Sequence, residues 1–199
     1  VILLLAFAPV FAIALFIWWK DKYDKEPIGL LVKSFLLGSL CCLPAGVTNE
    51  LGAQLLDINV FSDNQISISK ATVYAFLVVG LGEELFKFLC LIKYAFPKNE
   101  FNEPFDGIVY SVMISLGFAG LENVFYVAEG GAAVAVGRAF TAVPFHAVDG
   151  IIMGYFVGIA KFSEGYSRAA NCFKGLLFAV LDHGFYDFFL FQGESDLIM

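Results

Sequence analysis

Three charged residues lie within two helical turns of one another, inside an apolar segment long enough to cross a lipid bilayer. The segment covers residues 71–92 and contains Glu83, Glu84 and Lys87. A charge at the centre of a membrane helix costs about 2.5–3.5 kcal/mol on insertion scales, so such residues face protein or trapped water instead of lipid. Charged groups kept at this depth usually serve a function. We therefore expect the segment to contribute to a functional site.

The composition indicates an integral membrane protein. Of the 199 residues, 59% are hydrophobic and 16% are charged, whereas soluble domains carry about 25% charged residues. The net charge of −7 argues against a nucleic acid as partner, because proteins that bind nucleic acids present basic surfaces. The cysteines lie in or beside apolar runs without the spacing of metal ligands, so we interpret them as small buried side chains: Cys41, Cys42, Cys90 and Cys172.

Six apolar stretches are long enough to span a bilayer, since about 20 helical residues cross its hydrocarbon core. They cover residues 1–19, 28–48, 71–94, 105–127, 138–162 and 172–191. Polar residues connect them, with a long connection over residues 49–70 and a small-residue loop over residues 128–137. We see no internal repeat. The sequence therefore predicts an all-α, polytopic bundle of about six transmembrane helices that forms a single membrane domain over residues 1–199.

The distribution of Lys and Arg predicts the orientation in the membrane, because cytoplasmic loops are enriched in these residues. The odd-numbered connections carry eight of them, namely Lys20, Lys22, Lys25, Lys93, Lys98, Lys161, Arg168 and Lys174. The even-numbered connections carry two, Lys70 and Arg138. We therefore place the odd connections in the cytoplasm and both chain termini on the extracytoplasmic side. Arg138 is interpreted as an anchor at the membrane interface.

Three later apolar segments also carry polar residues at depth: Glu122 with Asn123, His146 with Asp149, and His183 with Asp187. Counted at 1.5 Å per residue from the outer end of each span, Glu83, Glu122 and the two histidines lie about 8–18 Å deep. Residues three or four apart share a helix face, so each histidine shares a face with its aspartate. We expect these groups to meet in one layer of the bundle, over core helices within residues 71–191.

Two smaller features complete this prediction. Gly150, Gly154 and Gly158 recur every fourth residue after His146, a pattern that lets membrane helices approach closely and that turns His146 toward the bundle interior. Asp106 follows Pro104 at the start of a span, where capping of the helix N-terminus is its expected role.

Carboxylates and imidazoles in a water-holding cavity suit hydrolysis of an amide bond, with one carboxylate as base and neighbouring donors for the oxyanion. The candidate catalytic residues are Glu83, Glu84, Glu122, His146 and His183, supported by Lys87, Asn123, Asp149, Asp187 and Arg138. No serine or cysteine has a convincing partner as nucleophile. A divalent metal such as zinc is an alternative, held by Glu84, Glu122, His146 and His183, although the chain lacks a His-Glu-x-x-His pair.

Two other functions use the same sequence features. Buried Glu and His residues also form proton relays, which would make the chain a proton-coupled transporter or a channel; the absence of an inverted repeat argues against this. A non-catalytic scaffold that binds a partner helix through its glycine-rich face is the third alternative.

Several motifs, in order along the chain, resemble the PrsW family of intramembrane proteases. Glu83-Glu84-Leu-Phe-Lys87 resembles its Glu-Glu-x-x-Lys motif, and Phe118 followed by Glu122 resembles its Phe-x-x-x-Glu motif. The remaining blocks are Arg138 with His146, Gly150 and Gly154, and the final His183-x-x-x-Asp187 segment.

The resemblance implies an integral protein of the bacterial cell membrane, related to type II CAAX prenyl endopeptidases and Abi-type proteins, in which a glutamate activates water. It implies Glu83 or Glu84 as the base, with His146 and His183 as stabilisers or metal ligands. Those relatives carry histidine at the position of Glu122. The implied substrate is a membrane-anchored protein, and PrsW-like proteases are associated with cutting the extracytoplasmic part of an anti-sigma factor.

Overall fold

The computed structural model describes residues 2–59 and 66–192, and all regular structure in these ranges is helical. The elements are α1 (Ile2–Lys20), α2 (Ile28–Leu56), α3 (Ile68–Val73), η1 (Tyr74–Gly80), α4 (Leu81–Cys90), η2 (Leu91–Ala95), α5 (Pro104–Phe140), α6 (Ala142–Lys161) and α7 (Gly165–Phe191). The π-helical segment η1 joins α3 to α4, and η2 extends α4, so that residues 68–95 form one continuous helical rod. The predicted all-α class is confirmed.

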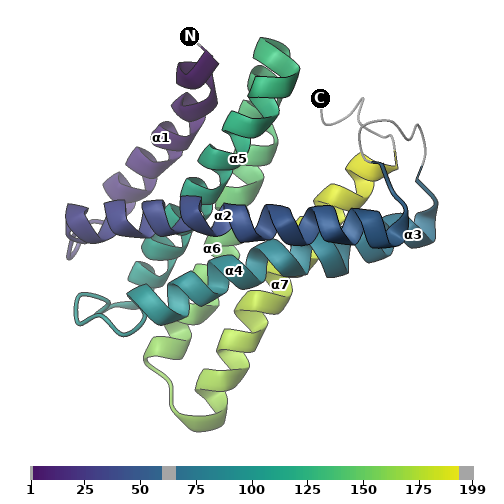
Figure 1. Ribbon diagram of the computed structural model, residues 1–199. Coiled ribbons are helices and arrows are strands. Elements are labelled where there is room, and N and C mark those ends of the chain that lie inside the picture. The colour runs from purple at the N-terminus through teal and green to yellow at the C-terminus, as the bar shows by residue number, and fades with distance from the viewer. Residues whose placement is uncertain (1, 60–65, 193–199) are drawn as a thin grey trace.

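Helix α5 forms the centre of the bundle and contacts α1, α2 and α6 (Figure 1). Its residues 109–120 are all buried, as expected for a helix that is apolar on every side and lies inside a larger protein. Helices α2 and α4 contact each other and run across the other helices, while α7 packs against α6 and η1 (Figure 1). The candidate functional site lies among α2, α4, α5, α6 and α7.

Close helix contacts depend on glycines that face a neighbouring backbone. A Cβ at Gly117 of α5 would lie 1.9 Å from the Phe35 carbonyl oxygen of α2, and one at Gly38 would lie 1.9 Å from that of Ile114. The predicted stripe on α6 behaves in the same way, because a Cβ at Gly154 would lie 2.4 Å from the carbonyl oxygen of Gly107. Small residues therefore let α5 sit against two partners at backbone distance.

The outer face of α2 is a continuous apolar stripe. Side chains at intervals of three or four residues are at least half exposed along the whole helix: Ile28, Val32, Leu36, Leu40, Leu43, Val47, Leu51 and Leu55. Such spacing puts them on one helix face. By length and composition, two stretches of the described chain are apolar enough to cross a membrane, α2 and the α5–α6 stretch Pro104–Lys161. The number of six spans stays a prediction.

Two predicted connections are wrong in part. Residues 128–137 are helical on both sides of Gly131, but the chain reverses at Gly131, which has φ 71° and ψ −157°. Arg138 therefore reaches Glu122, 16 residues earlier, which a straight helix would hold about 24 Å away. The predicted loop thus lies where the chain reverses but is much shorter than expected, and Thr141 only interrupts the helix between α5 and α6. The connection predicted over residues 49–70 begins later, since α2 continues to Leu56 and ends with Asp57 in the left-handed conformation. Asp63 lies outside the described residues.

The odd-numbered connections meet at one end of the bundle. Asn102 Nδ2 donates to Asp24 Oδ2 at 2.9 Å, and Lys161 Nζ donates to the Lys98 carbonyl oxygen at 3.1 Å. At the same end Asp106 accepts the backbone N–H groups of Asn102 and Glu103, both at 2.8 Å. The predicted capping role of Asp106 is confirmed.

The buried carboxyl group of Glu26 lies beside the Asp106 cap. Tyr110 donates a hydrogen bond to Glu26, which precedes α2. Burial raises the pKa of Glu26 to about 8. This side chain is therefore largely protonated at neutral pH and can donate a hydrogen bond toward Asp106.

The α2–α5 contact gives a stability prediction. Gly117→Ala should lower the free energy of unfolding by about 1–3 kcal/mol, because the added methyl group would overlap the Phe35 backbone and force the helices apart. The thermal midpoint of the purified protein in detergent measures this effect. Gly29→Ala is the matched control in α2, since a Cβ there meets nothing within 4 Å. Equal midpoints for both variants would contradict the packing described here.

Candidate functional site

A cavity of about 1130 Å³ opens between α2 on one side and α5, α6 and α7 on the other. Its polar lining comes from five helices, α2, α4, α5, α6 and α7, and includes Asn49, Glu50, Gln54, Glu83, Glu122, Arg138, His146, Asp149, His183 and Asp187. Aromatic side chains complete the wall, among them Phe118, Phe125, Tyr126, Phe145 and Tyr186. The structure thus brings the predicted polar residues of four separate segments to one cavity.

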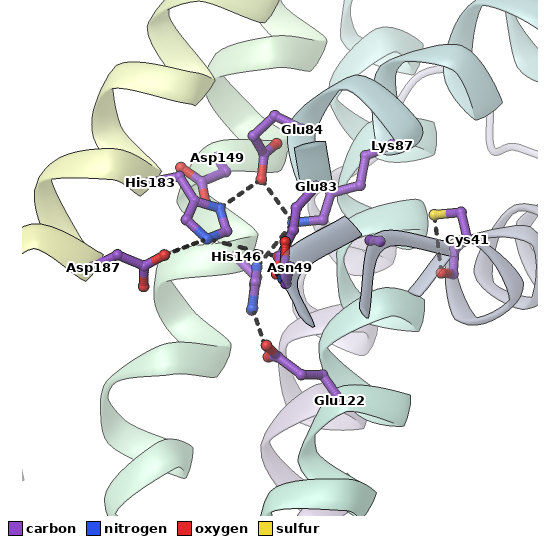
Figure 2. Close-up of polar contacts among 12 residues, drawn as sticks. Cys41, Asn49, Glu83, Glu84, Lys87, Glu122, His146, Asp149, His183 and Asp187 are labelled. Atoms are coloured by element: carbon purple, nitrogen blue, oxygen red, sulfur yellow. Dashed lines mark hydrogen bonds and ion pairs between the residues drawn. The ribbon is translucent and has the colours of Figure 1, made fainter. Parts of the chain in front are cut away.

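Lys87 lies at the centre of the charged residues, with 1% of its surface exposed. Its ammonium nitrogen lies 2.7 Å from Glu84 Oε1, 3.0 Å from His146 Nδ1 and 3.7 Å from Glu83 Oε2 (Figure 2). The same nitrogen lies 4.2 Å from the centre of the Phe118 ring, within the range of a cation–π contact. Lys87 therefore links α4 to α5 and α6 and compensates the charge of two glutamates.

His183 of α7 is surrounded by carboxylates. Its Nδ1 lies 2.8 Å from Glu84 Oε1 and 3.4 Å from Asp149 Oδ2. Its Nε2 lies 3.4 Å from Asp187 Oδ2 and 3.7 Å from Glu83 Oε2 (Figure 2). Each ring nitrogen therefore faces oxygens that only accept hydrogen bonds, and each can act as a donor.

Glu122 is held by a second cation. The Arg138 guanidinium forms an ion pair with Glu122, and its Nε donates to Asn123 Oδ1 at 2.6 Å. Asn123 Nδ2 in turn donates to the Ala6 carbonyl oxygen at 3.1 Å, which ties the group to α1. The Arg138 guanidinium turns toward the partly buried Glu122 carboxylate, and the interpretation of Arg138 as an interfacial anchor stays a prediction.

The two bonds of His146 define its protonation. A lysine ammonium has hydrogens to donate and no lone pair, so His146 Nδ1 accepts the bond from Lys87. The ring hydrogen is then on Nε2, which lies 3.1 Å from Glu122 Oε2 and donates to it. Lys87, His146, Glu122 and Arg138 form one continuous chain of hydrogen bonds and ion pairs.

The adjacent glutamates of α4 have different surroundings. Glu83 lines the cavity, whereas Glu84 does not, because consecutive helical residues point about 100° apart. Glu84 Oε1 accepts hydrogen bonds from Lys87 Nζ and His183 Nδ1. Glu83 Oε1 accepts a hydrogen bond from Asn49 Nδ2 at 2.9 Å, and its Oε2 makes no hydrogen bond with any described residue. Glu84 Oε2 likewise makes no hydrogen bond with a described residue, so the two glutamates differ in that Glu83 lines the cavity and Glu84 does not.

Asn49 was not among the predicted site residues, because the sequence places it at the start of a polar connection. A signal was present in the spacing of α2. Ala45, Asn49 and Gly52 continue the helical spacing of its buried face, at intervals of four and three residues. Extending this spacing past residue 48 identifies Asn49 as a polar side chain that faces the interior.

Two groups of side chains offer donors to a metal ion. Glu84, His146, Asp149 and His183 have ligand atoms within 4.8 Å of one another, and so do Glu83, Glu122 and His146. Imidazole nitrogens and carboxylate oxygens are suitable ligands for zinc. The predicted ligand set contains Glu122 where the first of these groups contains Asp149. Glu122 belongs to the second group, with Glu83 and His146. Lys87 already forms hydrogen bonds with Glu84 and His146, which are two members of the first group. A metal ion bound there would therefore compete with the Lys87 ammonium.

Comparison with known proteins shows the family. The model of the PrsW family intramembrane metalloproteases matches residues 26–198. The protein named Protease PrsW from Halalkalibacterium halodurans is 36% identical over 182 residues, which cover 92% of this chain and 80% of the relative. The protein of the same name from Bacillus subtilis is 34% identical over 183 residues, covering 92% of this chain and 79% of the relative. That of Geobacillus kaustophilus is 33% identical over 187 residues, with 94% and 78% covered.

No solved structure is significantly similar to the chain. The family match and the curated relatives extend over nearly all of the sequence, including every residue described around the cavity. The chain belongs to the PrsW family of intramembrane proteases.

Proposed function

We propose that Glu83 is the general base of this protease and that it activates the water that attacks a peptide carbonyl. The supporting observation is the difference between the two glutamates: Glu83 lines the cavity and accepts one hydrogen bond, from Asn49, whereas Glu84 is outside the cavity lining and is engaged by Lys87 and His183. A base must have a free oxygen within reach of the water it deprotonates. Glu84 then serves to fix the positions of Lys87 and His183.

The remaining side chains have roles that follow from their donors. Glu83 takes a proton from water while the hydroxide adds to the carbonyl carbon, and the proton then passes to the leaving amine. The Nε2–H group of His183, whose nearest acceptors lie 3.4 and 3.7 Å away, stabilises the oxyanion, and the Nε2–H group of His146 can do so when substrate displaces it from Glu122. Glu122 and Arg138 orient His146, while Asp149 and Asp187 orient His183.

The residues also fit a divalent metal such as zinc, which the description of the family implies. Glu84, His146, Asp149 and His183 would hold it. Such an ion supplies a Lewis acid that polarises a carbonyl or lowers the pKa of a bound water. Metal analysis of purified wild type and Asp149→Asn distinguishes the two forms of the proposal, because stoichiometric zinc that is lost in the variant would assign these ligands.

The proposed substrate is a membrane-anchored protein, and the extracytoplasmic part of an anti-sigma factor is the specific candidate. We further propose six transmembrane spans in a single domain over residues 1–199, with the catalytic helices in 71–191, in a bacterial cell membrane. The contacts of Asn102 with Asp24 and of Lys161 with Lys98 support a shared cytoplasmic side for the odd connections. Both termini are then extracytoplasmic. Family membership favours hydrolysis over a transporter, a channel or a scaffold.

Removal of the base tests the mechanism. Glu83→Gln keeps the size of the side chain and should lower kcat by about 10²–10⁴-fold, the usual contribution of a general base. Cleavage of a membrane-anchored substrate co-reconstituted in liposomes measures the loss. Glu129→Gln, at an exposed position of α5, is the control for the same chemical change. Cleavage by Glu83→Gln at the wild-type rate would remove Glu83 from the role of base.

Partial filling of the cavity tests whether substrate enters it. Gly46 of α2 lines the cavity, and a Cβ there meets nothing within 4 Å. Gly46→Leu should therefore fold normally and reduce kcat/KM about tenfold or more, since one misplaced apolar group in a binding pocket has effects of this size. Gly29→Leu, which adds the same bulk to α2 away from the cavity, should cleave normally. Wild-type activity of Gly46→Leu would place substrate elsewhere.

A further inference from the structure

Asn49 of α2 reaches across to α4 and touches the proposed base. We propose that Asn49 is a positioning residue that holds the Glu83 carboxylate in its working orientation, an inference that rests on the role proposed above for Glu83. Figure 2 shows the two side chains together, with Asn49 Nδ2 lying 2.9 Å from Glu83 Oε1. Within the described chain, this is the one hydrogen bond that the Glu83 carboxylate accepts.

The chemistry of the two groups fixes which atom faces which. An ionised carboxylate only accepts hydrogen bonds, so the carboxamide must present its NH₂ group to Glu83. The terminal torsion of a glutamate has a broad energy profile, so the carboxylate can rotate unless a partner holds it. Because Asn49 engages Oε1, the other oxygen, Oε2, is kept 3.7 Å from both Lys87 Nζ and His183 Nε2, without a hydrogen bond to a described residue. The bond therefore determines which oxygen of Glu83 is left to act as the base.

Glycines on both helices bring Asn49 within reach of α4. A Cβ at Gly82, next to Glu83, would lie 3.3 Å from Thr48 Oγ1 and 3.9 Å from Asn49 Oδ1. One turn further along α2, a Cβ at Gly52 would lie 2.2 Å from Val78 Cγ1. Larger residues at either position would push α2 outward and lengthen the bond from Asn49 to Glu83.

The backbone at Asn49 is also tied to the rod that carries the base. The Tyr74 hydroxyl of η1 lies 3.3 Å from the Asn49 carbonyl oxygen and donates to it. Asn49 itself lines the cavity, in the wall formed by α2. The Asn49 side chain thereby couples the position of this wall to the orientation of Glu83. Its loss should affect the chemical step more than substrate binding.

The test compares three variants in the liposome cleavage assay. Asn49→Leu removes the donor at similar size and should lower kcat about 10–100-fold with KM unchanged, as is usual when a residue that orients a catalytic group is lost. Asn49→Gln keeps the NH₂ group and should recover part of that loss. Thr48→Val, the neighbour whose hydroxyl bonds its own helix at Ala45, should keep wild-type kcat and KM.

Each outcome decides the inference. Wild-type kcat in Asn49→Leu, with Glu83→Gln inactive, overturns the role of Asn49 and leaves Glu83 as base; wild-type activity in Glu83→Gln overturns both. A rise in KM without a fall in kcat would make Asn49 a binding residue and also overturns the positioning role. If Asn49→Leu does not fold, Asn49→Asp decides, because it keeps the shape and replaces the donor by an oxygen; unimpaired kcat in that variant overturns the inference.

Discussion

Charge compensation by the buried Lys87 ammonium is the interaction on which the arrangement of the site depends. Glu83 and Glu84 are both within 3.7 Å of it, and removing one partner of a buried ion pair costs about 3–5 kcal/mol. Glu84 is shared with His183 of α7, and Lys87 is shared with His146 of α6. The charged face of α4 can therefore be buried only while α6 and α7 lie against it, so that the same bonds that make these charges tolerable also assemble the cavity wall.

The helices around the site must present apolar side chains to lipid and polar side chains to the cavity. Along its exposed face α2 presents an apolar stripe, of which Leu43, Val47 and Leu51 also border the cavity, and it contributes Asn49 to the polar lining. Glycines at Gly38 and Gly117 bring α2 to backbone distance from α5. A polar cavity enclosed by apolar helix faces strengthens electrostatic interactions inside it. Hydrolysis of a peptide bond in a membrane needs such an enclosed, polar space.

Much of this site is predictable because the membrane makes buried charge expensive. Glu83, Lys87, Glu122, His146 and His183 stand out in apolar segments, and helical spacing relates each to its neighbours. Three features could not be predicted in that way. The helical residues on both sides of Gly131 and the extension of α2 to Leu56 depend on tertiary contacts, since Ala-rich and polar segments are compatible with either helix or loop. The inward turn of Arg138 depends on Glu122, which lies 16 residues earlier and before the chain reversal at Gly131, and charge counting alone cannot distinguish an inward guanidinium from one at the interface.

The central claim is that the charged groups share one chamber filled with water inside the membrane, and cysteine labelling tests it most directly. In a variant with the four native cysteines replaced by alanine, a single cysteine at Gly46 lines the chamber, whereas one at Leu36 lies on the outward apolar stripe. Thiols react as thiolates, which form in water and not in lipid. The account predicts that a water-soluble maleimide modifies Gly46→Cys and leaves Leu36→Cys unmodified in intact membranes. Modification of Leu36→Cys with none at Gly46→Cys would contradict it.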